Sequence, residues 1–167
     1  DSAKLLEEYN IPYNVFPAID DKEQGARGLR DTMLAIFKEA IENNYDAILV
    51  FEDDIKFIEG KETFHDTMNK AVIQLPENYH LLYLGGQPTA GYSHFHSPNL
   101  LPAIKYFATH SVVYSKQGIK EILSRNMGYP IDNWLVTDIQ TEGHCFAIHP
   151  ILCSQRAGFS DIGRGEI

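Results

Sequence analysis

The sequence predicts an α/β domain in which helices alternate with buried strands. Residues 31–43 carry apolar side chains at spacings of three and four, which is typical of an amphipathic helix. Residues 47–51 are continuously apolar, as expected of a strand covered on both faces. The pattern recurs where a helical segment at 61–75 is followed by an apolar run at 80–84. This repeated order of helix and buried strand favours a layered α/β fold.

Size and charge limit the classes of function. A chain of 167 residues is expected to form one domain over residues 1–167. The net charge of -9 argues against binding to nucleic acid, so a polyanionic substrate would need a metal ion or local cations. No apolar run is long enough for a transmembrane segment. Cys145 and Cys153 do not suggest a disulfide framework, which favours a reducing compartment such as the cytoplasm.

The first elements are expected to be a short helix at residues 2–8, which Ser2 could cap, and a strand at residues 13–19. A flexible approach at residues 24–28 then leads into the long helix. Arg27 in this approach could meet a phosphate, although a lone glycine pair is weak evidence for such a site.

Later elements follow the same reasoning. Residues 88–102 lose periodicity and form a long loop, which in a compact domain is usually functional or mobile. The pattern then predicts a strand at residues 106–114 and a helix at 115–125. Asp132 is a natural N-cap for the next helix, and residues 144–152 read as a last strand.

Three consecutive acids, Glu52, Asp53 and Asp54, follow the apolar run at 47–51. Ligands of open α/β sheets bind at the carboxyl ends of strands, so these acids are expected at the mouth of a site. Adjacent carboxylates repel one another, and a hard cation such as Mg²⁺ or Mn²⁺ would relieve that repulsion. The plain alternative is a solvated acidic turn.

Two further stretches are candidates for ligand contact. Gly85, Gly86 and Gln87 end the second apolar strand, where a backbone can approach a ligand closely, although a tight turn is the more common reason for such a pair. Tyr92 and its aromatic neighbours in the long loop suit stacking on sugar rings. His94 and His96 in the same loop are more often surface residues than metal ligands.

The ordered motifs FEDD, YLGG, ATHSVVYSKQGIKEIL, PIDNWL, FAIHPIL and FSDI resemble glycosyltransferase family 25. That family includes bacterial lipooligosaccharide galactosyltransferases and collagen galactosyltransferases. The resemblance runs from about residue 13 to residue 162. It implies a Rossmann-like three-layer α/β/α sandwich of the A-type glycosyltransferase fold, with a mixed, mostly parallel sheet that lacks the family's usual first strand.

The resemblance also implies a reaction and a metal. A hexose, galactose by family likeness, would pass with inversion from a UDP-sugar to a saccharide acceptor. Asp54, with Glu52 or Asp53, would hold Mn²⁺ or Mg²⁺ at the diphosphate. Asp132 matches the acidic residue of the PIDNWL segment and is the first candidate for the general base, with Asp138 second. As a plain helix cap, Asp132 would need no catalytic role.

Other positions are assigned more loosely by the same resemblance. His149 would approach the metal. Donor or acceptor contacts would come from the segment ends and loops, namely Arg27, Gly85, Gly86, Gln87, Tyr92, His110, Gln155, Ser160 and Asp161. The partners implied are a nucleotide-sugar and a glycan, with possible peripheral association at the inner face of a membrane that carries the acceptor.

Two other classes stay open. A noncatalytic sugar-nucleotide or glycan-binding domain derived from such an enzyme would share these motifs without transfer. A metal-dependent phosphohydrolase is less favoured, because His80, His110 and His144 are scattered through strands, where core or surface roles are usual.

Overall fold

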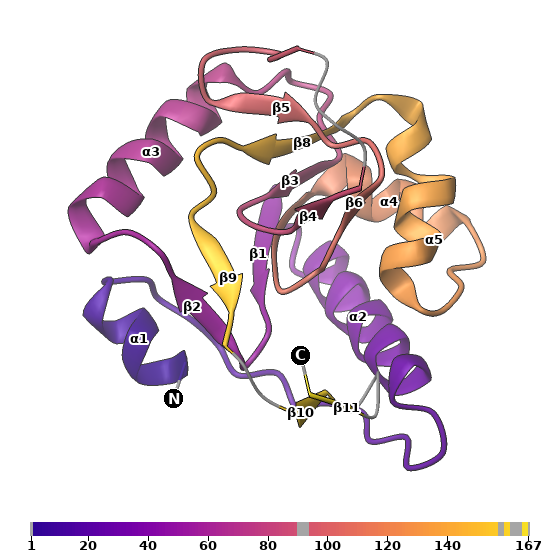
Figure 1. The fold of residues 1–167 in the computed structure, drawn as a ribbon. Coiled ribbons are helices and arrows are strands. Elements are labelled where there is room, and N and C mark those ends of the chain that lie inside the picture. The colour runs from indigo at the N-terminus through magenta and orange to yellow at the C-terminus, as the bar shows by residue number, and fades with distance from the viewer. Residues whose placement is uncertain (1, 90–93, 157–158, 161–164, 167) are drawn as a thin grey trace.

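The computed structural model describes residues 2–89, 94–156, 159–160 and 165–166, the last two pairs by their backbone only. Five α-helices and a short 3-10 helix connect a central sheet and three small ribbons (Figure 1). The helices are α1 (Ser2–Glu8), α2 (Gly25–Glu42), α3 (Lys61–Gln74), α4 (Lys116–Ser124), α5 (Ile131–Asp138) and η1 (Gln140–Glu142). The strands are β1 (Ala47–Phe51), β2 (Ile55–Phe57), β3 (Leu81–Tyr83), β4 (Gln87–Pro88), β5 (Leu100–Pro102), β6 (Tyr106–Phe107), β7 (Ser111–Ser115), β8 (Cys145–Ile148), β9 (Cys153–Gln155), β10 (Phe159–Ser160) and β11 (Gly165–Glu166).

The central sheet has five strands in the order β1-β7-β3-β8-β5. It is mixed, as expected, but the expectation of mostly parallel pairing is wrong for the described strands: only β3 and β8 pair in parallel, and the other three neighbouring pairs are antiparallel. Strands β1, β3 and β8 nevertheless point the same way. Their carboxyl ends therefore lie at one edge of the sheet, which is the edge that the acidic motif follows.

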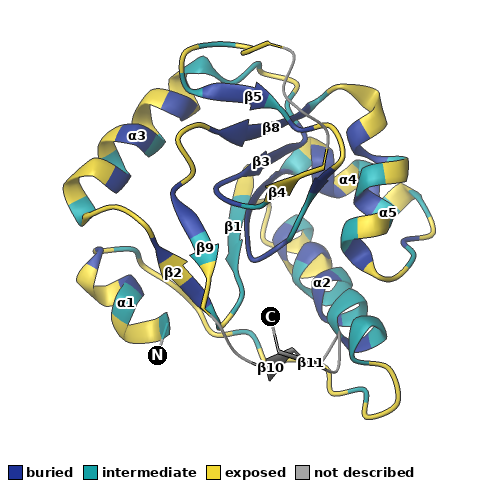
Figure 2. Ribbon diagram, viewed as in Figure 1, coloured by how far each residue is buried: buried dark blue, intermediate teal, exposed yellow. Residues whose placement is uncertain are grey.

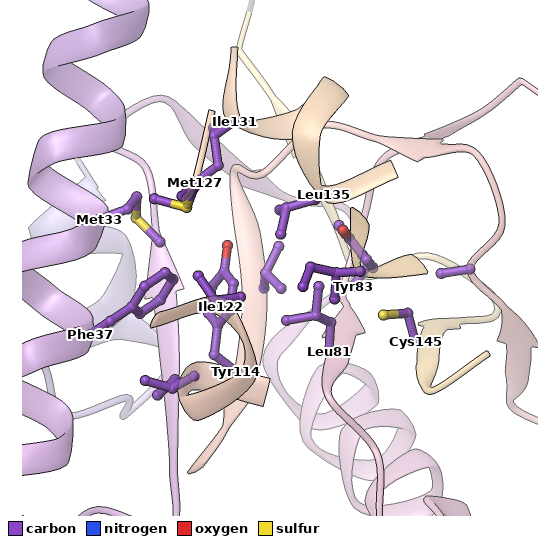
Figure 3. Close-up of a cluster of buried hydrophobic side chains, with 14 of the residues drawn as sticks. Met33, Phe37, Leu81, Tyr83, Tyr114, Ile122, Met127, Ile131, Leu135 and Cys145 are labelled. Carbon is purple, nitrogen blue, oxygen red and sulfur yellow. The ribbon is translucent and has the colours of Figure 1, made fainter. Parts of the chain in front are cut away.

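Apolar side chains from β3 alternate between two separate cores. Leu81 and Tyr83 pack with α2, α4 and α5 on one face, while Leu82 and Leu84 pack with α1, α3 and β2 on the other. Figure 3 shows the first core, where Phe37 of α2 meets Tyr114 of β7. Figure 2 shows that β3 and β8 are buried along their length. The central strands are thus covered on both faces, which explains their continuous apolar runs.

The predicted strand at residues 13–19 is not formed, which corrects the sequence interpretation. These residues have no strand partner, and the Val15 side chain is 81% exposed. Instead the segment is attached to α2, because the Ile19 amide donates to Thr32 Oγ1 at 2.8 Å. An alternating pattern forms a strand only where a neighbouring strand accepts its hydrogen bonds, and none is described here.

The strand predicted at residues 106–114 is divided into two pieces. β6 pairs with β4, whereas β7 pairs with β1 and β3. Between them Ala108 has a φ of 79°, in the left-handed region that non-glycine residues seldom adopt. This turn redirects the chain between two different sheets, and it places the residues after Ala108 beside the acidic motif.

The helix predictions agree better with the structure, except that α2 begins at Gly25 and not at residue 31, so residues 25–28 are helical and do not form the predicted flexible approach. Helix α1 has the predicted range, but Ser2 lies within it and donates its hydroxyl proton to the Asp53 carbonyl rather than acting as a cap. Ser115 does cap α4, since its Oγ accepts the Gly118 amide at 3.0 Å. Both cysteines are free and buried. Within the described residues, no helix has both the length and the apolar character needed to cross a membrane.

Candidate functional site

The candidate site lies where β1 ends. The Glu52 amide donates to the His110 carbonyl at 2.9 Å, so the motif leaves β1 while still attached to the start of β7. Asp54 is followed at once by β2, which pairs with β9 and brings Gln155 opposite Ile55. The three acids therefore form a sharp turn between β1 and β2, and each of these strands is paired with another strand.

A pocket of about 120 Å³ opens beside this turn. We call it the acidic pocket. Two carboxylates from distant segments line it, Glu52 after β1 and Asp132 in the first turn of α5. The remaining lining residues are Ala26, Leu29, Ala108, Thr109, Pro130, Ile131 and Gln155. Three residues that the sequence analysis singled out separately, Glu52, Asp132 and Gln155, are thus brought together.

Glu52 is the most perturbed acid of the site. Its Oε1 accepts a hydrogen bond from Thr109 Oγ1 at 2.9 Å. Burial raises the pKa of Glu52 to about 7, and the negative charges of Asp54, Asp132 and Asp53 add to the rise. The Thr109 hydrogen bond acts in the opposite direction. Glu52 is therefore protonated more readily than an exposed glutamate.

Asp54 is partly buried next to it. Gln155 Nε2 donates to Asp54 Oδ2 at 3.2 Å, while the buried Oδ1 has no hydrogen-bond partner among the described residues. Burial, followed by the charge of Asp53, raises the pKa of Asp54. Asp53 itself is exposed. Of the three acids, Glu52 and Asp54 thus have desolvated oxygens, and Asp53 faces water.

Helix α5 places the two candidate bases far apart. Asp132 is not the N-cap that the sequence predicts: the helix starts at Ile131 after Pro130, and Asp132 Oδ1 accepts the neighbouring Asn133 amide at 3.2 Å. The carboxylate of Asp132 therefore does not cap the helix. Asp138 ends the helix and accepts from Thr137 Oγ1 at 2.6 Å. Six residues of helix separate the two by about 9 Å, and Asp138 does not line the acidic pocket.

The glycines after β3 have a packing role. A Cβ on Gly85 would lie 1.9 Å from the Cys153 carbonyl oxygen. A Cβ on Gly86, whose φ is 148°, would lie 2.4 Å from the Phe107 carbonyl oxygen. Both glycines therefore allow strands to approach closely, and neither lines the acidic pocket. Gln87 is exposed in β4.

The histidines lie outside the pocket. His110 is buried, its Nδ1 pairs with Ser111 Oγ at 2.8 Å, and burial lowers its pKa to about 4. His149 is exposed after β8, where its ring meets Phe95 with centroids 5.2 Å apart. Two strands lie between β1 and β8, a separation of about 14 Å at the usual strand spacing. The structure thus does not bring His149 to the acids.

Arg27 lies in the first turn of α2, next to the pocket residue Ala26. Its guanidinium pairs with Asp21, and it lies 3.9 Å from Glu23. The pairing with Asp21 raises the pKa of Arg27 further and lowers that of Asp21. Tyr92 and Asp161 lie outside the described residues, and Ser160 is described only as part of β10.

Sequence reasoning missed Thr109 and Ala108. Both belong to a stretch that reads as the interior of a strand, and Thr109 has no charge that would mark it. The signal that identifies them is structural: the left-handed backbone at Ala108 and the hydrogen bond to Glu52. Strained backbone of this kind is often found at functional sites.

The carboxylate oxygens fit a hard divalent cation only as a partial ligand set. Among the described residues, no group of three or more His, Cys, Asp or Glu is arranged to hold a metal. Mg²⁺ and similar ions are often bound by one or two carboxylates together with substrate phosphates and water. The buried, unpartnered Asp54 Oδ1 and the desolvated Glu52 are consistent with such a site. Comparison of the chain with protein-family models and with curated proteins gave no match.

Proposed function

We propose that this chain is a cation-dependent glycosyltransferase of the A-type fold, which moves a hexose, galactose by family likeness, from a UDP-sugar to a saccharide acceptor. The observation that carries the proposal is the acidic pocket beside the end of β1, which Glu52 and Asp132 both line. This is the edge of an α/β sheet at which ligands are commonly bound.

Each acid has a role in this proposal. Glu52 and Asp54 would hold Mn²⁺ or Mg²⁺, which supplies positive charge for the diphosphate leaving group. Asp132 takes the proton of the acceptor hydroxyl. The oxygen of that hydroxyl forms a bond to the hexose, and the bond from the hexose to UDP breaks. Its place in the pocket and its carboxylate, which is not occupied by helix capping, favour Asp132 over Asp138. We place the activity in the cytoplasm, at a membrane face that carries the acceptor.

A thermal-shift experiment tests the donor site without knowledge of the acceptor. A ligand that binds only the folded chain raises its melting temperature by mass action. UDP and UDP-galactose are expected to raise the melting temperature in the presence of Mn²⁺ and not in its absence, while CMP and GDP serve as comparisons. A chain that responds to none of these ligands would contradict the proposal.

Variants then separate the roles. Asp54→Asn is expected to lose the Mn²⁺-dependent shift, and Asp132→Asn is expected to keep the shift but lose sugar transfer. Asp46→Asn is the matched control, because Asp46 is a fully exposed carboxylate that pairs with Lys116 at 3.0 Å just before β1. If Asp132→Asn transferred sugar at the parental rate, another group would be the base.

A second candidate is a noncatalytic sugar-nucleotide or glycan-binding domain, which would use the same acidic pocket for binding without sugar transfer. A binding domain would retain ligand shifts but release no UDP from UDP-galactose. Slow, Mn²⁺-dependent release of UDP by the parent chain, absent from Asp132→Asn, would exclude this candidate.

A further inference from the structure

A second depression lies next to the acidic motif, since it is lined by Ile55, which follows Asp54, and by Arg156. It has a volume of about 370 Å³, about three times that of the acidic pocket. We call it the cationic groove. Helix α1, strand β2 and the residue after β9 contribute its lining residues, which are Lys4, Leu5, Glu8, Ile55, Lys56 and Arg156.

The charge of this groove is opposite to that of the chain. Lys4, Lys56 and Arg156 outnumber Glu8 by three to one among its lining residues. The whole chain has 23 acids against 14 lysines and arginines. A local excess of cations on an acidic protein attracts anions to that place and leaves the rest of the surface repulsive to them.

Hydrogen bonds fix the position of Arg156 at the end of the groove. Its guanidinium donates to the Asp53 carbonyl at 2.5 Å and to Ser2 Oγ at 3.1 Å, and its amide donates to the Asp54 carbonyl at 2.8 Å. Because a guanidinium has five donors, some remain for a ligand. A positioned guanidinium loses less side-chain entropy on binding an anion than a free one does.

Two residues that are adjacent in the chain line the groove and the acidic pocket. Gln155 lines the pocket and bonds to Asp54, and the next residue, Arg156, lines the groove. A ligand long enough to span Gln155 and Arg156 would therefore contact cations at one end and the candidate base, Asp132, at the other. The apolar lining residue that a ligand can reach is the partly buried Leu5, because Ile55 is fully buried.

We propose that the cationic groove binds the acidic end of an anionic saccharide, so that the acceptor is a sugar with a phosphate or carboxylate group. The assignment of this saccharide as the acceptor rests on the proposed transferase function. The anion site itself rests only on the groove and its three cations.

The test uses galactose 6-phosphate, galacturonic acid and galactose as probes, with binding to the whole chain followed by NMR. Both acidic sugars are expected to bind more tightly than galactose, and added salt should weaken their binding. Preference for galactose 6-phosphate would assign a phosphate ligand, and preference for galacturonic acid a carboxylate. Equal binding of all three probes would overturn the proposal.

Variants locate the site. Lys4→Ala combined with Lys56→Ala should weaken binding of the preferred acidic sugar on the order of tenfold, since two exposed charge contacts are lost. Lys38→Ala combined with Lys120→Ala is the matched control, because both lysines are exposed on α2 and α4, outside the groove. Unchanged affinity in the groove variant, or an equal loss in the control, would contradict the assignment.

The outcome is independent of the donor experiment. If acidic sugars bind the groove while UDP and Mn²⁺ never bind, the anion site stands and the transferase function fails. If UDP binds with Mn²⁺ and acidic sugars do not, the transferase function stands and the acceptor is not anionic.

Discussion

Two polar regions inside this molecule differ in whether the protein itself satisfies them. The buried side chain of Gln140 is hydrogen-bonded at both polar atoms: its Oε1 accepts the Tyr106 amide at 2.9 Å, and its Nε2 donates to the Tyr83 hydroxyl and the Tyr106 carbonyl at 2.9 and 2.7 Å. At the acidic pocket and the turn beside it, like charges lie near one another, and the buried Asp54 Oδ1 has no hydrogen-bond partner among the described residues.

The difference distinguishes polar groups that stabilise the fold from polar groups that are available to a ligand. A satisfied network such as that of Gln140 stabilises a particular arrangement of strands and needs no ligand. A desolvated group of acids lowers stability unless something else supplies positive charge. The second region is therefore where a ligand would gain most by binding, and the following substitutions test this contrast.

The largest expected effect is on the satisfied network. Gln140→Leu would leave the buried Tyr83 hydroxyl and the Tyr106 amide without their partner, and it should lower the free energy of unfolding by roughly 2–4 kcal/mol. Urea denaturation measures this loss. Gln117→Leu, at an exposed position of α4, is the matched control and should change stability little. If Gln140→Leu lost no more stability than Gln117→Leu, the hydrogen bonds of Gln140 would not stabilise the fold.

The reverse effect is expected in the acidic pocket. Because the pKa of Glu52 is raised from its ordinary 4.5 to about 7, ionisation of this group destabilises the folded state. The penalty is absent below about pH 4.5, grows as pH rises to 7, and is complete above it. Glu52→Gln should thus raise the free energy of unfolding by roughly 3 kcal/mol at pH 8 and by nothing at pH 4. Equal stability of parent and variant at pH 8 would show that Glu52 is not desolvated.

His80 sharpens the comparison with a shift of opposite sign. Burial, followed by the charge of His144, lowers its pKa from 6.5, although Glu142 and Glu121 act against this and Arg125 acts with it. Stability from neutral His80 is complete above pH 6.5 and is lost as pH falls through its folded-state pKa. His80→Gln should flatten the stability profile below pH 6.5 and leave the alkaline side unchanged. If the stability of His80→Gln fell below pH 6.5 as steeply as that of the parent, His80 would not be the cause of that fall.

The smallest effect is expected at Ala108. Its φ of 79° suits glycine better than alanine, so Ala108→Gly should stabilise the chain by about 0.5–1 kcal/mol. The Thr109 hydrogen bond to Glu52 should remain, and Ala103→Gly, at a position without this backbone conformation, should destabilise instead. Chemical denaturation of both variants distinguishes the two signs.

Sequence reasoning predicted most helices and the buried strands, because their periodicity follows directly from burial, but it started α2 six residues too late and joined β6 and β7 into one strand. It also placed Glu52 correctly at a strand end. It was wrong about residues 13–19, whose alternation has no neighbouring strand to satisfy it, and about Asp132, which Pro130 displaces from the N-cap position.

The site features that sequence reasoning missed depend on contacts between residues that are far apart in the chain. No local pattern shows that Thr109 reaches Glu52, that Gln155 reaches Asp54, or that two strands separate His149 from the acids. The closeness of Gly85 to the Cys153 carbonyl likewise depends on the packing of β9 across the end of β3. These facts come from the topology of the sheet and not from spacing in the sequence.

The central claim is that the acidic pocket is completed by a divalent cation together with a nucleotide diphosphate. Calorimetric titration of Mn²⁺ into the chain with UDP present tests it most directly. The account predicts saturable Mn²⁺ binding that needs UDP, is lost in Glu52→Gln and Asp54→Asn, and is retained in Asp46→Asn. Mn²⁺ binding that persists in both Glu52→Gln and Asp54→Asn, or that never occurs in the parent, would contradict it.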